Sequence, residues 1–456
     1  MDYNIVRKNI DVEYAVAEIN LQDKVLLVGL GAVGKSFLEI LKEQGLFNPE
    51  LFYCVDCNEE ALNVFIQAGG YEEHFILKKI EKNNYLSLLD IVGREGYILD
   101  FSVNVKSIDM LNMCIENGIH YLSLADSSWF PDPTWFSAHQ HYKEYRKIFK
   151  RIKSEKHPTC LIEFGMNPGM ISCFLKQCIE DIIENDESDY IKKHREKLKK
   201  LLRQKQYNKV AKKIGVKYVI EVDNDNQEFN VEPKNDTVYS PWCPFSFYME
   251  TYAAPEIIFG TKKEFLVYKE LSDCDYSDLY VSLTQAGMDY REHVFSPQGE
   301  VEGFLTTHEE IFSMCHLLQD HRYKPTTYFV YSPSKIAEAS AARCRANDII
   351  KCQIMNRDEI IAGGESVGII VQGERFHSRY FGNYLDNTDL HETATVRQVS
   401  ASAYAAFRYM LQNTEEGVLM PEDLPHKDLL ATAKKYLKEY ISVPCKDVKP
   451  NLGTSW

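Results

Sequence analysis

The stretch KVLLVGLGAVGKSFLEIL, residues 24–41, combines three local signals. KVLLV is an apolar run of the kind that forms a strand buried on both faces. Gly29, Gly31 and Gly34 follow it with the spacing GxGxxG, and VGKSFLEIL then has the apolar period of a helix. A strand, a glycine-rich turn and a helix in this order predict a βα unit whose turn holds a pyrophosphate.

Each residue of this turn has a mechanical task. Gly29 permits the tight change of direction, Gly31 lets the pyrophosphate approach the backbone, and Gly34 lets the helix pack closely on its strand. Ala32 and Val33 begin the helix, whose N-terminus attracts anionic oxygens. We therefore expect all five residues to contact a dinucleotide.

An acidic residue follows at a suitable distance. Asp56 ends the next apolar run, 22 residues after Gly34, where its carboxylate can accept hydrogen bonds from ribose hydroxyls. Residues 57–60 include no arginine to receive a 2′-phosphate, so NAD is predicted rather than NADP. The glycine motif by itself is also compatible with FAD.

Strand-like and helical stretches alternate over the first 170 residues. The apolar runs lie at residues 24–28, 51–55, 74–77, 97–101, 120–124 and 159–163. This alternation predicts a Rossmann-type α/β domain, a doubly wound parallel sheet with helices on both faces. The later pattern is typical of a second, α+β domain. We expect domains at 20–168 and 169–393, with a helical segment, 394–456, packing back on the first.

Three predicted strands end in small or polar residues, and such ends line the cofactor crevice of an open α/β sheet. The three exits are DFSVNVKS (100–107), SLADSSW (123–129) and EFGMNPGM (163–170). We assign Ser102 and Asn167 to the cofactor, although an asparagine before Pro168 and Gly169 is equally typical of a turn.

Composition narrows the class of partner. The 456-residue chain is 45% hydrophobic and has a formal charge of −15, which disfavours nucleic acid and anionic membranes and attracts small cations. The basic stretch 192–213 has helical periodicity and is interpreted as a solvated surface helix. Because no apolar run approaches a membrane span of about 18 residues, we expect a cytoplasmic protein.

The twelve cysteines are too dilute for a disulfide scaffold and are expected to be reduced thiols. Cys54 and Cys57 have zinc-like spacing, but no second pair of ligands follows them in the sequence. No metal site is therefore predicted.

Several longer motifs carry a resemblance to a known family. They are the glycine-rich start, DFSVNVKSIDMLNMCIENGIHYLSLADSSW (100–129), FGMNPGM (164–170), PWCPFSFYMETYAAPE (241–256), THEEIFSM (307–314) and ATVRQVSASAYA (394–405). In this order, over residues 20–425, the chain resembles bacterial-type homospermidine synthase, within the saccharopine-dehydrogenase-like group. The resemblance implies a homodimer in which the second, α+β domain binds the substrate and supplies the dimer interface. It also implies that bound NAD is used to join two putrescines into homospermidine, with loss of ammonia through an imine and no net redox change.

The resemblance also implies roles for individual residues. Trp242, Glu250 and Asn167 are expected to be catalytic, with the Trp242 ring placed against an ammonium or iminium ion. Without the resemblance, a buried core tryptophan and a surface glutamate would be the ordinary interpretations. The expected diamine-binding residues are Asp223, His308, Glu310, Asn104 and Asp126.

The chain departs from the family pattern at the ends of the fourth and fifth predicted strands. Asn104 and Ser127 stand where the family tends to carry acidic residues, although Asp126 is one position away. Asp223 stands where a glutamate is usual. These changes remove or shorten carboxylates, which puts the identity and length of the diamine in question.

Two other functions stay open at this point. A saccharopine or carboxynorspermidine dehydrogenase would couple an amine and an aldehyde with NAD(P)H and would need an anion site, for which Arg343, Arg345 and Arg375 are candidates. A non-catalytic NAD-binding relative would keep the fold without the chemistry.

Overall fold

The computed structural model describes residues 7–8, 19, 21–129, 137–152, 156–261, 273–275, 280–345 and 350–450. The chain divides into two compact units. The Rossmann unit comprises residues 11–170 and 396–436, and the mixed-sheet unit comprises residues 1–10, 171–395 and 437–456. Each unit is described below by itself.

The Rossmann unit is built on a seven-stranded sheet in the order β21-β7-β6-β5-β2-β3-β4, in which every pair is parallel. When β2 to β7 are numbered 1 to 6 in chain order, their order across the sheet is 3-2-1-4-5-6, which is that of a doubly wound dinucleotide-binding sheet. The six predicted strands are confirmed. The strands are β2 (Val25–Val28), β3 (Phe52–Asp56), β4 (Phe75–Leu77), β5 (Tyr97–Asp100), β6 (His120–Ser123), β7 (Cys160–Leu161) and β21 (Val418–Leu419).

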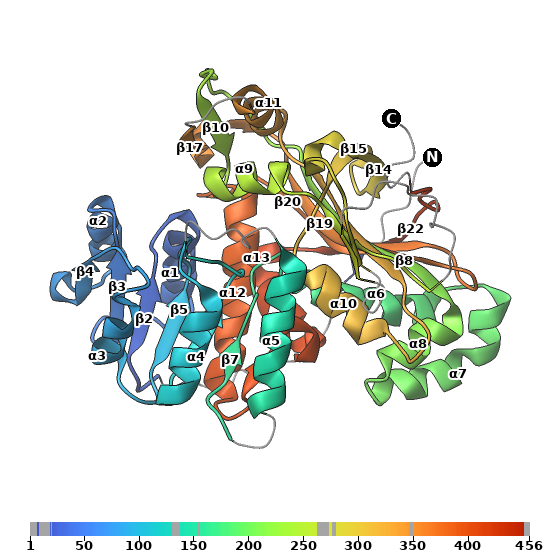
Figure 1. Ribbon diagram of the computed structural model, residues 1–456, viewed down its shortest axis with the longest axis horizontal. Helices are drawn as coiled ribbons and strands as arrows, with labels where there is room; N and C mark the ends of the chain where they lie inside the picture. Colours follow the sequence, from blue (N-terminus) through green and yellow to red (C-terminus); the bar gives the residue numbers. More distant parts are fainter. Residues whose placement is uncertain are drawn as a thin grey trace. The chain divides into compact units, whose positions relative to one another are not determined.

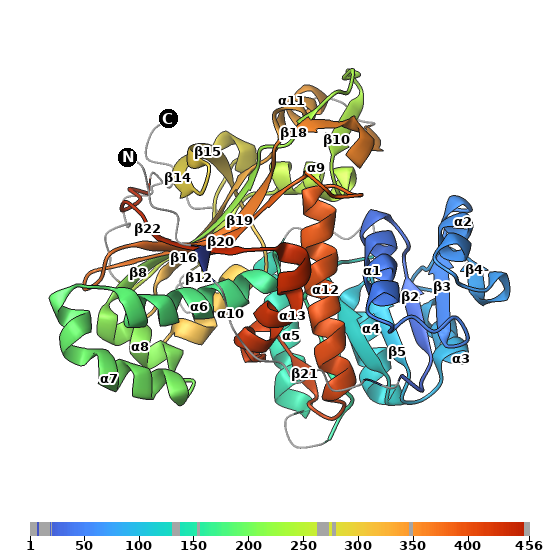
Figure 2. The ribbon, with the colours of Figure 1, turned by 180° about the vertical axis from the view of Figure 1, so that it is seen from behind.

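Helices surround this sheet because most of them have one apolar face to bury. Figure 2 shows α12 alongside α1, where the buried hydroxyls of Ser36 and Ser400 lie 2.8 Å apart. One apolar core joins strand residues such as Leu26 and Ile98 to helix residues such as Leu111. The helices are α1 (Ala32–Glu43), α2 (Glu60–Gln67), α3 (Leu89–Val92), α4 (Ser107–Asn117), α5 (Ala138–Ile152), α12 (Ala394–Gln412) and α13 (His426–Leu437).

The mixed-sheet unit is built on an eleven-stranded sheet whose main path is β1-β22-β20-β19-β8-β16-β11-β13-β12. The long strand β8 pairs with β16 in parallel and with β19 antiparallel, and the hairpin β14–β15 joins at β16. The strands are β1 (Arg7–Lys8), β8 (Val216–Asp225), β11 (Glu256–Ile258), β12 (Asp273–Asp275), β13 (Tyr280–Ser282), β14 (Arg291–Ser296), β15 (Gly299–Thr306), β16 (Thr326–Ser332), β19 (Gly364–Gly373), β20 (Arg379–Asp386) and β22 (Tyr440–Pro444).

Smaller elements complete this unit (Figure 1). The short strands form two separate pairs, parallel β10 (Thr237–Ser240) with β17 (Lys351–Ile354) and antiparallel β9 (Glu228–Phe229) with β18 (Ile360–Ala362). The helices are α6 (Met170–Asn185), α7 (Asp189–Arg203), α8 (Tyr207–Ile214), α9 (Pro244–Tyr252), α10 (Glu310–Leu318) and α11 (Lys335–Cys344). The predicted fold class, a Rossmann-type sheet plus a second α+β domain, is confirmed by these two sheets.

The segment 394–456 is divided between the units. Helices α12 and α13 lie almost wholly in the Rossmann unit, whereas β22 pairs antiparallel with β20 in the mixed sheet. The periodicity of a short apolar run such as YISVP does not distinguish a strand from a helix. Its secondary structure depends on pairing with a strand that is distant in the sequence. The helical prediction therefore did not anticipate β22.

The basic stretch 192–213 is helical, as predicted, but spans parts of two helices, α7 and α8. Their buried residues are Ile191, Leu198, Leu202, Tyr207, Val210, Ala211 and Ile214. In the part of the chain that the structure describes, every helix is too short or too polar to cross a bilayer.

Candidate active site

The glycine-rich turn lies between β2 and α1. Gly29 has φ +91°, and a Cβ on it would lie 2.9 Å from the Phe101 carbonyl oxygen. A Cβ on Gly34 would lie 3.0 Å from the Gly29 carbonyl oxygen. These two positions therefore need glycine for the fold itself, because a side chain would separate the helix from the strand.

Gly31 differs from its neighbours because a Cβ there would meet no protein atom within 4 Å. It is the N-cap of α1 and brings no side chain to the amides of the first turn, which includes Ala32 and Val33. Open space beside unpaired amides at a helix N-terminus is the arrangement that binds a phosphate group. The geometry thus fits the dinucleotide predicted from the sequence.

Asp56 closes this turn from the end of β3. Its Oδ2 accepts a hydrogen bond from the Leu30 amide at 2.6 Å, and its Oδ1 accepts one from the Asn58 amide at 2.8 Å. Each carboxylate oxygen keeps a second lone pair for a ribose hydroxyl. The fixed negative charge would oppose a 2′-phosphate, which fits the predicted preference for NAD.

Asp100 ends β5 and is buried. Its carboxylate accepts hydrogen bonds from the Ser102 hydroxyl at 2.6 Å and the Tyr121 hydroxyl at 2.9 Å. Burial raises the pKa of Asp100 to about 6, and these hydrogen bonds oppose the rise. Ser102, predicted to contact the cofactor, is thus held by a carboxyl group that the sequence analysis did not single out. The signal was an acidic residue that ends an otherwise apolar strand.

The two positions that depart from the family pattern contact each other. Asn104 has φ +65°, and its backbone amide donates a hydrogen bond to the Ser127 hydroxyl at 3.0 Å. The side-chain oxygen of Asn104 is buried and accepts no hydrogen bond from a described residue. The exit loops of β5 and β6 are therefore joined here by a neutral contact.

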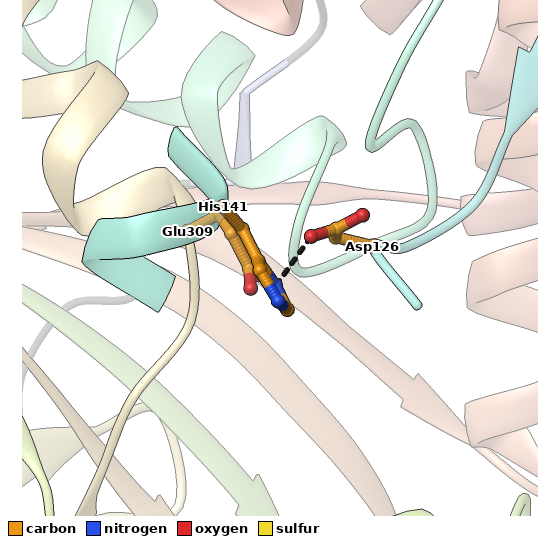
Figure 3. A group of neighbouring side chains, drawn as sticks. All are labelled: Asp126, His141 and Glu309. Carbon is orange, nitrogen blue, oxygen red and sulfur yellow. Dashed lines mark ion pairs between the residues drawn. The ribbon is translucent and has the colours of Figure 1, made fainter. Parts of the chain in front are cut away.

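Asp126 is engaged within the Rossmann unit. It forms a buried ion pair with His141 of α5 (Figure 3), and it accepts a hydrogen bond from the Tyr145 hydroxyl at 2.6 Å. Burial and the charges of Asp126 and Glu163 raise the pKa of Tyr145 far above its usual range, so the phenol stays a donor. The predicted role of Asp126 in binding an amine stays a prediction, but its carboxylate already has an imidazole and a phenol as partners.

Asn167 lies half-buried in the loop that joins β7 to α6. A Cβ on Gly169, which has φ +130°, would lie 2.1 Å from the Gly165 carbonyl oxygen, so the loop folds back on itself only with glycine there. Glu163, at the start of the loop, is fully buried and has φ +58°. The loop therefore holds Asn167 on a constrained backbone at the end of the parallel sheet.

The mixed sheet carries a row of buried acidic side chains. Glu221, Asp223 and Asp225 alternate along β8 and so point to one face, and Glu365 of β19 lies opposite Asp225. All four side chains are buried. Asp223 alone among them was predicted from the sequence, although the alternation in IEVDND was the signal for the row.

Burial raises the pKa of two of these groups, and for Glu365 the neighbouring charges add to this effect. Burial and the charges of Asp223 and Asp225 raise the pKa of Glu365 well above its usual range. Burial raises the pKa of Asp225 to about 6, against hydrogen bonds from Gln227 and Ser334. The row is therefore partly protonated near neutral pH, and a cation beside it would favour its ionised form.

His308 lies between two carboxylates near this row. Its Nδ1 is 3.2 Å from Glu310 Oε1, and its Nε2 is 3.5 Å from Glu250 Oε1. Burial alone would lower the pKa of His308, but Glu310 and Glu250 raise it well above its usual range. The imidazolium form therefore bridges the loop before α10 to α9, and the predicted pair His308 and Glu310 lies beside the predicted Glu250.

Aromatic rings stand next to these charges. The Phe329 ring lies 4.9 Å from the His308 ring in an edge-on contact, and Tyr331 stacks on Phe329 at 6.1 Å. Trp242 is half-buried in the turn between β10 and α9, and its backbone amide donates to the Ser240 hydroxyl at 3.3 Å. Trp242 and Glu250 thus belong to one turn–helix segment, which Pro244 begins.

Two arginines that favoured an anion site have other partners. Arg345 forms a bidentate pair with Asp289, with both N···O distances 2.6 Å. Arg375 donates to the Lys213 carbonyl oxygen at 2.7 Å and lies over the Tyr190 ring. Arg343 is exposed at the end of α11. These contacts lessen the support for a carboxylate-binding site built from them.

Comparisons with known proteins agree with this architecture. Residues 25–161 match the family model described as the saccharopine dehydrogenase NADP binding domain. The curated homospermidine synthase of Mesorhizobium japonicum is 21% identical over 439 residues, which cover 91% of this chain and 88% of that protein. The homospermidine synthase of Blastochloris viridis is 22% identical over 450 residues, covering 92% and 90%. The predicted resemblance to homospermidine synthase is confirmed.

Solved structures show the same fold. Homospermidine synthase from Legionella pneumophila, determined in complex with NAD, has a TM-score of 0.81 at 20% identity and covers 94% of this chain and 92% of its own. The L-Glu-forming saccharopine dehydrogenase of Saccharomyces cerevisiae has a TM-score of 0.53 at 9% identity, covering 94% and 100%. The predicted two-domain architecture is thereby confirmed at the level of the fold.

A first prediction separates the two tasks of the glycine turn. We expect Gly31→Val to lower the free energy of unfolding by no more than about 1 kcal/mol, the cost of a poorer N-cap residue, because its Cβ meets open space. NAD binding should weaken at least ~10-fold, because the side chain would stand where the pyrophosphate approaches. Gly34→Val should instead lose ~1–3 kcal/mol of stability.

Fluorescence titration with NAD and urea unfolding of the three proteins would test this. Unchanged NAD affinity in Gly31→Val, or an equal loss of stability in both variants, would contradict the assignment.

A second prediction concerns Asp100. Its pKa is raised to about 6 in the folded protein, against about 3.9 unfolded. Its stabilising contribution is therefore fully present below pH ~4 and is lost as the pH rises through ~6. Asp100→Asn removes this dependence, so its free energy of unfolding relative to wild type should rise by ~3 kcal/mol between pH ~4 and ~8.

Chemical denaturation at both pH values measures this difference. Ser102→Ala serves as the control, because it removes one donor but keeps the titrating carboxyl group. A difference between Asp100→Asn and wild type that is the same at both pH values would show that Asp100 does not titrate in this way.

Proposed function

We propose that this chain is an NAD-dependent homospermidine synthase, which joins two putrescine molecules with release of ammonia and no net redox change. One observation carries the proposal. His308 is held between Glu250 and Glu310 beside a buried acidic row, in a chain that resembles curated homospermidine synthases over 91% and 92% of its length.

The acidic groups suit a diamine. Putrescine carries two ammonium groups at neutral pH, and removing their water is costly unless carboxylates replace it. Glu250 and Glu310 meet at His308, and Asp223 lies one strand repeat from Glu221 in the row. We assign the distal ammonium to Glu310 and Asp223, and the reacting end to Glu250.

The cofactor is assigned to the Rossmann turn. The open space at Gly31 fits a pyrophosphate, and the fixed Asp56 carboxylate favours NAD, although the matched domain model is described by NADP. The Legionella pneumophila relative was determined with NAD. NAD supplies the acceptor and the donor for one hydride, and this chain's residues must place the amine carbon and handle protons.

Glu250 is the proposed proton carrier at the reacting amine. His308 Nε2 faces its Oε1, which leaves the other oxygen for an ammonium group. An amine must lose a proton before it can attack an imine, and the departing nitrogen must gain one, so a carboxylate at this place serves both steps. Trp242 would shield the iminium and stabilise its charge by a cation–π contact of roughly 0.5–2 kcal/mol.

Asn167, held on its constrained loop, would orient the amine by its side-chain amide. Asn104 and Asp126 remain predictions as diamine ligands, and the engagement of Asp126 with His141 weakens its case. A homodimer formed through the mixed-sheet unit and a cytoplasmic location also remain predictions.

A third prediction tests the function directly. Purified protein incubated with NAD and putrescine should form homospermidine and ammonia in equal amounts, measured by chromatography, with no accumulation of NADH absorbance. If an amine and an aldehyde acid instead consume NADH, the chain is a reductive coupling enzyme. NAD binding without either reaction would support a non-catalytic relative.

A fourth prediction tests the proton carrier. Glu250→Gln should lower kcat at least ~100-fold, because the amide cannot take up a proton, while NAD affinity stays unchanged. Glu300→Gln changes an exposed glutamate on β15 and serves as the matched control. Wild-type kcat in Glu250→Gln would exclude Glu250 from the chemistry.

A further inference from the structure

Glu221 is a buried acidic residue of the mixed-sheet unit whose presence the proposed roles do not explain. It lies in the middle of β8, is fully buried, and neither of its carboxyl oxygens accepts a hydrogen bond from a described residue. An ionised carboxylate in such a place would lose its hydration without replacement, which is strongly unfavourable. The group must therefore be neutral or must meet a cation.

The side chain meets the cluster around His308. A carboxyl oxygen of Glu221, a ring nitrogen of His308 and a carboxyl oxygen of Glu310 all lie within 4.8 Å of one another. Glu310 is also buried, and it faces His308 at 3.2 Å. Glu221 thus lies beside both Glu310 and His308, within the cluster to which the distal ammonium group is assigned.

The groups that face Glu221 come from several elements. Its partners across the sheet, Phe329 of β16 and Ile369 of β19, bring no charge. Glu310 comes from α10, His308 from the loop before α10, and Asp223 from β8 itself. The charge of Glu250, from α9, raises the pKa of His308. The neighbours of Asp223 are Asp225, Glu365 and Tyr331. His308 is the one cation among these groups.

The charges of Glu221 and its neighbours follow from this arrangement. Burial and the neighbouring Glu310 carboxylate raise the pKa of Glu221 well above its usual range, and His308 only partly offsets them. Glu221 is therefore protonated at neutral pH and can donate its proton toward Glu310. With His308 positive and both Glu310 and Glu250 negative, the four groups carry a net charge of −1 in total.

We propose that Glu221 is a positioning residue of the diamine site: its carboxyl group holds Glu310 through a shared proton before the diamine binds, and it releases that proton when an ammonium group binds to Glu310. This proposal rests on the proposed function, because the ammonium group is that of the diamine. The charges balance in this exchange, because one ammonium group binds at the site and one proton passes from Glu221 to the buffer. No covalent bond of the diamine changes.

The exchange has two consequences. Diamine affinity should increase as the pH rises toward the range in which Glu221 ionises unaided, because proton release then costs less. The Glu221 carboxylate formed on binding also adds a negative charge beside Glu310, which strengthens the binding of the ammonium group. A neutral residue at position 221 would lose both effects but keep the fold, because it copies the protonated form.

Calorimetry of putrescine binding to the NAD complex tests the proposal. Titrations at pH ~7.5 in two buffers of different ionisation enthalpy give the number of protons released per diamine. Glu221→Gln should release about one proton fewer than wild type and bind putrescine ~10-fold more weakly, with kcat nearly unchanged. Glu221→Asp keeps an acid and should restore most of the release.

Glu292→Gln is the matched control, since Glu292 is also buried, on β14 of the same unit, but is not part of the cluster. It should release as many protons as wild type. Equal proton release by wild type and Glu221→Gln would overturn the proposal. So would weaker binding in Glu221→Gln and Glu221→Asp alike with no change in proton number, since that result indicates a merely structural role.

A second readout needs no substrate and separates this proposal from the proposed function. In protein labelled with 13C at glutamate carboxyl groups, the resonance that is missing from Glu221→Gln should report a protonated acid at pH ~7. An ionised Glu221 at neutral pH would overturn the inference whether or not homospermidine forms. Loss of putrescine binding in wild type, with Glu221 protonated, would instead refute the proposed function.

Discussion

The cost of burying carboxyl groups beside one another is the constraint on which the site of the mixed-sheet unit depends. Glu221, Asp223 and Asp225 share one face of β8, and Glu365 and Glu310 join them from β19 and α10. Their charges cannot all persist in a place that excludes water. The protein meets this cost by protonating some of them, by hydrogen bonds to Asp225, and by placing His308 between Glu310 and Glu250. A cationic substrate would relieve the same repulsion, which gives a site of this kind its preference for amines.

The carboxylates of the Rossmann unit are stabilised in a different way, by hydrogen bonds within that unit. Asp100 is satisfied by two hydroxyl groups, and Asp126 by an imidazole and a phenol, while Asp56 accepts two backbone amides. At Asn104 and Ser127, where the family pattern favours acidic residues, the contact is neutral. Every one of these groups contacts residues of its own unit, and the acidic row of the mixed sheet is where we propose that the diamine binds. This division agrees with a unit that holds a dinucleotide and another that holds a diamine.

Local sequence patterns predicted the Rossmann unit well for physical reasons. Gly29 and Gly34 allow close backbone contacts that another residue would block, and strands buried on both faces have continuous apolar runs. The short strands β21 and β22 were not predicted, because their identity depends on partners far away in the chain. No local sequence pattern indicates that His308 and Glu310 belong to a binding site, and only the family resemblance predicted them. Glu221 was visible as part of an alternating acidic pattern, but its burial depends on β16 and β19.

In the proposed reaction, one hydride leaves and returns within a single catalytic cycle. The most direct test is to supply an equal mixture of unlabelled putrescine and putrescine deuterated at both amine-bearing carbons, and to analyse homospermidine by mass spectrometry. If the hydride returns to the carbon from which it came, products will carry none, four or eight deuterium atoms. Products with an odd number of deuterium atoms would show that hydride passes between different substrate molecules, and would contradict a closed cycle.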